Sequence, residues 1–175
     1  MVKIRGNPLF KWIALIFLIG FSAAFQYNAA HYFAVAGVIP NLLLVTAITA
    51  GFALGSESGG FAGICLGLYQ DAQSGKILGM YALFYLYAGV IAGFFPKKSN
   101  LGDFPTALIA VYALTLLSES AVYLFAYAIP ILRGGLTPGT DLLRAAVRVI
   151  VPASFVNAFW CIPFFFILRP GAAPA

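Results

Sequence analysis

The sequence predicts an all-α integral membrane protein, with six transmembrane helices in a single bundle that takes up the whole chain, residues 1–175. Three observations support this fold class. Hydrophobic residues make up 62% of the chain and charged residues 9%, against roughly 25% charged residues in a typical soluble domain. The mean hydropathy is +0.97. Charged residues lie singly or in pairs between apolar runs, so we expect neither a second domain nor a nucleic acid partner.

The first apolar run is long enough for two helices. The 45 residues after Lys11 contain no Asp, Glu, Lys or Arg, whereas one helical crossing uses about 20 residues. We therefore expect helices at 12–28 and 34–54. The second should begin near Pro40 and Asn41, because proline fits the first turn of a helix. The basic N-terminus resembles a signal peptide, but the second crossing indicates a permanent first span.

Four further helices are expected at 56–72, 77–96, 104–132 and 141–168. The helix at 77–96 ends in aromatic and then basic residues, which is typical of a helix leaving the membrane. The helices at 104–132 and 141–168 are longer than one crossing requires, so they should tilt or extend beyond the bilayer. The helix at 56–72 has the weakest apolar run of the six.

Glycine recurs at every fourth position around the third helix. The glycines predicted to pack helices are Gly51, Gly55, Gly59, Gly63, Gly67, Gly75 and Gly79, and Asp71 takes the remaining place in the series. Residues four apart on a helix share a face, so this spacing predicts a groove without side chains. Such stripes of small residues are a main route to helix packing in lipid. The spacing therefore favours a packed helix at 56–72.

Basic residues predict the orientation. Six spans with the N-terminus inside place six basic residues in the cytoplasm and three outside, in agreement with the positive-inside rule. The inner set is Lys3, Arg5, Lys11, Lys97, Lys98 and Arg169, and the outer set is Lys76, Arg133 and Arg144. The ratio is the same if the segment at 56–72 does not cross, so the charges alone leave the number of spans open. The glycine spacing favours six spans with both termini in the cytoplasm.

Three ionisable residues are predicted within or near the membrane: Asp71, Glu119 and Arg148. A charge at the centre of a bilayer costs at least about 2.5 kcal/mol, so such a residue usually has a partner or a role. Glu119 and Arg148 can pair if their helices are staggered. The alternatives are a Glu119 that is protonated or bonded to neighbouring serines, and an Arg148 that reaches the interface. Asp71 can cap the fourth helix around residues 75–77, or contact a partner.

No pattern for catalysis is present. The sequence contains no phosphate-binding loop, no paired His and Glu on a helix, and no nucleophile beside a base. Cys65 and Cys161 lie in apolar runs, where they are expected to be small buried thiols. We expect no enzymatic activity, no cofactor and no metal site.

Residues 40–95 resemble the core of the MreD family, the small rod shape-determining membrane proteins of bacteria. That family shows a Pro and an acidic residue before a leucine run, a glycine-rich helix, then Gly-Leu, Asp, Ser-Gly, Leu-Gly and a helix ending in Gly. The matching residues are Pro40, Gly67, Leu68, Asp71, Ser74, Gly75, Leu78, Gly79, Gly89 and Gly93. Asn41 departs from the pattern, because it stands where the family has an acidic residue.

The resemblance implies a non-enzymatic scaffold of the cell-wall elongation machinery in the bacterial cytoplasmic membrane. It implies binding to an MreC-like bitopic protein and a requirement for rod shape, alongside MreB, RodA and a penicillin-binding transpeptidase. A homodimer is left open.

The resemblance also implies a six-helix fold similar to the S components of energy-coupling-factor transporters. The alternative function is therefore a substrate-binding S component for a vitamin or metal, which would dock its partner through alanines on the first helix. That helix offers Ala14, Gly20, Ala23 and Ala24, which do not form a repeated stripe.

Overall fold

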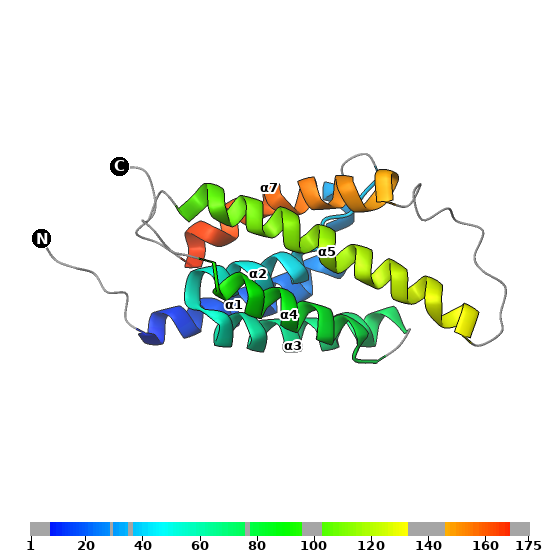
Figure 1. The fold of residues 1–175 in the computed structure, drawn as a ribbon. Helices are drawn as coiled ribbons and strands as arrows, with labels where there is room; N and C mark the ends of the chain where they lie inside the picture. Colours follow the sequence, from blue (N-terminus) through cyan, green and yellow to red (C-terminus); the bar gives the residue numbers. More distant parts are fainter. Residues whose placement is uncertain are drawn as a thin grey trace, which may run out of the picture.

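In the described part of the chain, six α-helices run back and forth along one axis, each antiparallel to the next of these helices (Figure 1). The computed structural model describes residues 8–28, 30–34, 37–75, 78–95, 103–132 and 146–168. Within these residues the α-helices are α1 (Pro8–Asn28), α2 (Leu42–Leu54), α3 (Ser56–Ser74), α4 (Met80–Gly93), α5 (Asp103–Leu132) and α7 (Val151–Leu168). A 3-10 helix, η1 (Ala30–Phe33), follows α1, and a π-helix, η2 (Ala146–Ile150), leads into α7. The predicted all-α fold with six helices is confirmed.

Helix α2 is the central element of the bundle. All twelve residues from Leu42 to Ala53 are buried, and α1, α3, α4, α5 and α7 all contact this helix. A helix that is apolar on all sides has to be covered on all sides. With 13 residues, α2 is about 20 Å long, shorter than the roughly 30 Å hydrocarbon core of a bilayer. Since five helices surround α2, its length is not set by the bilayer.

Two buried threonines of α2 satisfy their hydroxyl groups locally. Thr46 Oγ1 donates to the carbonyl oxygen of Leu42 at 2.8 Å, and it lies 2.6 Å from Ser22 Oγ of α1. Thr49 Oγ1 donates to the carbonyl oxygen of Val45 at 2.6 Å. A buried hydroxyl without a partner would destabilise the core, so these bonds allow polar residues in a fully covered helix.

Glycines bring α3 into close contact with α2 and α4. A methyl group on Gly59 would overlap the backbone of Gly51 and the carbonyl oxygen of Gly89. One on Gly63 would overlap the backbone of Tyr85, and one on Gly67 that of Ala82. The predicted packing role is therefore confirmed for Gly51, Gly59, Gly63 and Gly67. The groove predicted from the glycine spacing is filled by α4 of the same chain.

The packing role predicted for Gly55, Gly75 and Gly79 is wrong. A Cβ atom at any of these positions would have no neighbour within 4 Å. Their φ angles are +114°, +61° and +96°, and they lie at the ends of α2, α3 and α4. Glycine adopts positive φ without the steric penalty of a side chain. The spacing of four continues across these helix ends, so the pattern alone did not separate packing glycines from turn glycines.

The second helix begins at Leu42, so its expected start near Pro40 and Asn41 is confirmed and the predicted bound at residue 34 is wrong. Pro40 precedes the helix and Asn41 is its N-cap, so the expectation of a proline in the first turn is wrong. Gly37 has a φ angle of +80°, which a right-handed helix does not allow. The preceding residues are apolar enough for a span, but apolar content does not distinguish helix from extended backbone.

The remaining helix boundaries differ from prediction by smaller amounts, except at the last helix. Helix α4 begins at Met80 and ends at Gly93, inside the predicted 77–96. The last α-helix begins at Val151 because the π-helix η2 precedes it, and the predicted start at residue 141 lies outside the described residues. Helices α1, α3 and α5 begin within four residues of the predicted positions 12, 56 and 104.

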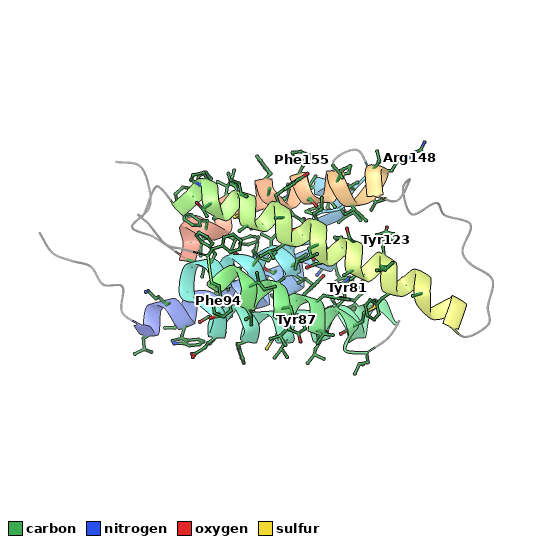
Figure 2. All side chains as sticks on the ribbon, viewed as in Figure 1. Tyr81, Tyr87, Phe94, Tyr123, Arg148 and Phe155 are labelled. Atoms are coloured by element: carbon green, nitrogen blue, oxygen red, sulfur yellow. The ribbon has the colours of Figure 1, made fainter. Side chains whose placement is uncertain are left out.

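The outer surface of the bundle carries large apolar side chains. Figure 2 shows Tyr87 of α4 and Phe155 of α7 on the outside of the bundle, and both side chains are exposed, as is Phe94 directly after α4. Helical stretches Phe104–Ala126 and Val147–Leu168 are long and apolar enough to cross a membrane, while α2 and α4 are apolar but shorter. An outer surface of this kind fits a lipid environment.

Most residues used to predict the orientation lie outside the described part of the chain. These are Lys3, Arg5, Lys76, Lys97, Lys98, Arg133, Arg144 and Arg169. Lys11 is described, and it is exposed near the start of α1. The start of α1 and the end of α7 lie at the same end of the bundle (Figure 1). This arrangement fits an even number of crossings.

Candidate functional site

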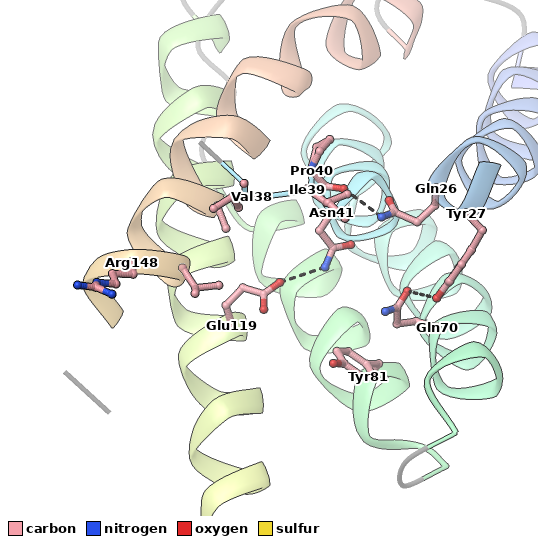
Figure 3. A pocket seen from close by; sticks show the side chains of 13 residues that line it. Gln26, Tyr27, Val38, Ile39, Pro40, Asn41, Gln70, Tyr81, Glu119 and Arg148 are labelled. Carbon is pink, nitrogen blue, oxygen red and sulfur yellow. Dashed lines mark hydrogen bonds between the residues drawn. The ribbon is translucent and has the colours of Figure 1, made fainter. Parts of the chain in front are cut away.

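A polar pocket of about 550 Å³ lies at one end of the bundle, which we call the pocket end (Figure 3). It forms where α1 and α3 finish and where α2 and α4 begin, with walls from α5 and η2. Its polar lining residues are Gln26, Tyr27, Asn41, Gln70, Tyr81, Glu119 and Arg148. Apart from these, its walls include Val38, Ile39 and Val149. Three of the four predicted non-glycine site residues, Asn41, Glu119 and Arg148, thus line one pocket, and Asp71 does not.

Asn41 connects four helices through one side chain and its backbone amide. Its Oδ1 accepts a hydrogen bond from the backbone N–H of Leu44 at 3.2 Å, which caps α2. Its Nδ2 donates to Tyr85 Oη at 2.7 Å and to Glu119 Oε1 at 3.0 Å. Its backbone N–H donates to Asn157 Oδ1 at 2.7 Å. Because Oδ1 faces a backbone donor, the orientation of the amide is fixed, and both hydrogens of Nδ2 point at α4 and α5.

Gln26 holds the start of α2 from the side of α1. Its Nε2 donates to the carbonyl oxygen of Pro40 at 3.0 Å, and its Oε1 accepts from the backbone N–H of Leu42 at 2.8 Å. The first N–H groups of a helix have no partner within the helix. Gln26 and Asn41 together supply acceptors for two of them. Both ends of the Gln26 amide are used in this way, so its role is structural.

Glu119 lies in the middle of α5 and is half-buried at the pocket. Within the described residues, its hydrogen-bond donor is Asn41 Nδ2 (Figure 3). A carboxylate offers about four acceptor sites on its two oxygens. The side chain therefore retains acceptor capacity on the pocket side.

Arg148 does not pair with Glu119. Both residues line the pocket, but Figure 3 shows the guanidinium of Arg148 directed away from Glu119, and Arg148 is exposed. Among the residues that the structure describes, the two form no ion pair. Arg148 belongs to η2, at the outer edge of the pocket wall, and its side chain extends outward from there. Of the alternatives that the sequence left open, the Glu119–Arg148 pair is thus not formed among the described residues.

Asp71 caps α4 from the last turns of α3. Its Oδ2 accepts from the backbone N–H groups of Gly79 at 2.9 Å and Ala82 at 3.1 Å, and its Oδ1 accepts from that of Tyr81 at 2.9 Å. The side chain is buried. The hydrogen bonds lie at residues 79–82 rather than at the expected 75–77, because α4 begins at Met80. A buried carboxylate with three backbone donors offers little surface for a partner.

Sequence reasoning missed three members of the polar network. Gln26, Tyr85 and Asn157 carry no charge, so the rule that predicts a role for an ionisable residue at membrane depth does not select them. Amides in apolar helices give a usable signal, since an amide in hydrocarbon also needs partners. Asn157 is fully buried, its Oδ1 accepts from Asn41, and its Nδ2 has no partner within the described structure.

The two cysteines are free thiols, with Cys161 buried in α7 and Cys65 partly buried in α3. Within the described residues, no group of three or more His, Cys, Asp or Glu side chains comes together. The chemistry of the pocket end is therefore that of one carboxylate, amides and tyrosine hydroxyls, which suits recognition of a polar group by hydrogen bonding.

Comparison with known protein families matches residues 7–170 to the family described as rod shape-determining protein MreD. No match was found among curated proteins or among solved structures. The family match extends on both sides of the segment at 40–95, whose residues carry the resemblance, and includes the helices that supply Gln26, Glu119 and Asn157 to the pocket end. Nearly the whole chain is thus accounted for by one family, and the protein belongs to the MreD family of rod shape-determining proteins.

Proposed function

We propose that this protein is a non-enzymatic membrane scaffold of the bacterial cell-wall elongation machinery and that it binds an MreC-like bitopic membrane protein. The observation that carries the proposal is the family match over residues 7–170, since the family determines rod shape. RodA and a penicillin-binding transpeptidase are proposed as further members of the assembly, and a second copy of the chain as another.

The packing of the bundle limits where a partner can bind. The glycine seam of α3 is filled by α4 and α2, so it is not free to receive a helix of another protein. Exposed apolar side chains remain on α1, α5 and α7, among them Ile16, Ile109 and Phe159. A transmembrane helix of an MreC-like protein would pack on such a surface by close van der Waals contact.

The proposed topology has six crossings in the cytoplasmic membrane with both termini in the cytoplasm. Alternating helix directions and the shared end of α1 and α7 support this proposal (Figure 1). Lys11 at the start of α1 favours a cytoplasmic position for that end. The pocket end would then face outward.

Depletion of the protein in its own host tests the proposed function. We expect rod-shaped cells to become round on depletion and to regain rod shape when the gene is supplied again. Cells that keep their rod shape and elongation rate without the protein would contradict the proposal. Enzymes of peptidoglycan synthesis should remain present in the depleted cells, because the protein is proposed to organise them and not to replace them.

The pocket favours one alternative function, a substrate-binding S component of an energy-coupling-factor transporter. A volume of about 550 Å³ lies within the usual range for small-molecule sites. The fold would then resemble those S components. However, Ala14 and Ala23 of α1 pack partly against the core, so they do not present a free stripe to a transporter partner. A purified sample that carries a stoichiometric vitamin or metal and associates with an ATPase would favour this alternative.

A further inference from the structure

The pocket end contains a carboxylate that pairs with no cation among the described residues. Among the described residues that line the pocket, Glu119 is the one acidic residue and Arg148 is the one basic residue. The guanidinium of Arg148 points away from the pocket (Figure 3). A carboxylate withdrawn from water is costly unless it is paired or well hydrogen-bonded, and in the described structure Glu119 has one donor, Asn41.

We propose that this pocket binds an organic cation, an ammonium or guanidinium group, with Glu119 as its counter-ion. The charge of the described lining fits this ligand, because Arg148, its basic residue, is turned outward. The aromatic residues Tyr27 and Tyr81 also line the pocket, and tyrosine rings attract cations through their faces. The ligand class goes beyond the scaffold role and does not depend on it.

The wall favours an organic cation over a metal ion. Divalent metals require several carboxylate, carbonyl, imidazole or thiolate ligands around one point. The described part of the chain brings no three His, Cys, Asp or Glu side chains together. One carboxylate beside amide and phenol groups instead matches the few donors of an ammonium or guanidinium ion. The pocket, at about 550 Å³, also has room for the alkyl stem that carries such a group.

Asn41 is a positioning residue for this site. Its amide is fixed by the Oδ1 contact to Leu44, so Nδ2 holds one oxygen of Glu119 at 3.0 Å and keeps the carboxylate at the wall. Nδ2 also contacts Tyr85 Oη at 2.7 Å. The oxygen of Glu119 that Asn41 does not bind is left for the ligand.

Binding of simple probe cations to the purified protein tests the proposal. We expect n-butylammonium and propylguanidinium chloride to raise the melting temperature in a saturable way. Neutral 1-butanol and sodium chloride at matched ionic strength should not do so. Glu119→Gln should weaken the apparent affinity for both probes at least tenfold. The Gln carbonyl still accepts from Asn41, so the variant keeps that hydrogen bond and should fold.

Glu57→Gln is the matched control. Glu57 is an exposed carboxylate in the first turn of α3, at the opposite end of the bundle from the pocket. Loss of the Glu57 carboxylate should leave the apparent affinity for both probes within twofold of that of the original protein. Equal weakening by Glu57→Gln and Glu119→Gln would mean that the probes respond to overall charge, and it would overturn the proposal.

Arg148 provides a second way for the proposal to fail. If Arg148 turns inward in solution and neutralises Glu119, the original protein will not bind the probes and Arg148→Gln will. That result would make Arg148 the cation of the pocket and would overturn the proposal. Equal affinity of the original protein and of Arg148→Gln for the probe cations would show that Arg148 does not neutralise Glu119, and it would support the proposal.

The source of the cation can be a free amine or a basic side chain of a protein partner. Native mass spectrometry of the protein extracted alone should show a bound small cation, absent from Glu119→Gln, if the source is free. Carbodiimide treatment of membranes that contain the MreC-like protein should join Glu119 to a lysine of that protein if the source is a side chain. Probe binding is measured on the isolated protein, so failure of this inference is distinct from failure of partner binding.

Discussion

At the scale of single residues, Asn41 combines an acceptor and two donors that no acidic residue can supply together. Oδ1 caps α2 through Leu44, and Nδ2 reaches both Tyr85 and Glu119. A carboxylate at this position would keep the cap and lose the donors, and it would place a second negative charge about 3 Å from Glu119. Asn41, which stands where the pattern that the sequence resembles has an acidic residue, thus donates to the carboxylate on α5.

Exchanging the amide of Asn41 and the carboxylate of Glu119 tests the hydrogen bond between them. Asn41→Asp should lower the free energy of unfolding by about 1 to 3 kcal/mol, because Glu119 loses its donor. Glu119→Gln added to Asn41→Asp should recover most of that loss, since the Gln amide can donate to Asp. Melting curves of the two single variants and the double variant give the coupling energy. Additive losses in the double variant would contradict the proposed pairing.

Asp71 provides the second prediction at this scale. Asp71→Ala leaves the N–H groups of Gly79, Tyr81 and Ala82 without their acceptor. We expect a loss of about 1 to 3 kcal/mol. Asp71→Asn should recover about half of the loss, because the single amide oxygen of Asn replaces the two carboxylate oxygens that accept these hydrogen bonds. The measurement is melting of the isolated protein in detergent. Unchanged melting of both variants, combined with lost partner binding, would make Asp71 an interface residue.

At the scale of elements, α3 and α4 depend on backbone contacts at glycine. Gly63→Ala should lower the melting temperature strongly, because its methyl group meets the backbone of Tyr85 and overpacking of this kind costs about 1 to 3 kcal/mol or more. Gly20→Ala in α1 is the matched control, since a Cβ atom there has open space. It should leave stability unchanged or raise it by up to about 1 kcal/mol. Equal effects of the two substitutions would exclude the tight α3–α4 seam.

The elements also show how far the sequence could predict the fold. Apolar runs and glycine spacing predicted six helices and the four packing glycines. The proline placed the start of α2 near residue 40, but the apolar run alone also allowed a start at residue 34, because the apolar residues before Pro40 suit extended backbone as well as helix. The pocket was not predicted, since it joins Gln26, Asn41 and Glu119 from three helices. Their proximity depends on how α1 and α5 pack around α2, which residue patterns within one helix do not report.

At the scale of the whole molecule, the proposed topology places both ends of the chain in the cytoplasm. Ala175→Cys, with Cys65 and Cys161 replaced by serine or alanine, should resist a membrane-impermeant thiol reagent in intact cells. It should react after the cells are lysed. Labelling of intact cells would mean an odd number of crossings, with one of the short helices not traversing the membrane.

The proposed function requires that this chain acts through an MreC-like partner in the membrane. Affinity purification of the tagged protein from native membranes in mild detergent tests this requirement. We expect an MreC-like bitopic protein to be retained in near-equal amount. Purification without any MreC-like protein, but with an ATPase and a bound vitamin or metal, would contradict the scaffold function and favour transport.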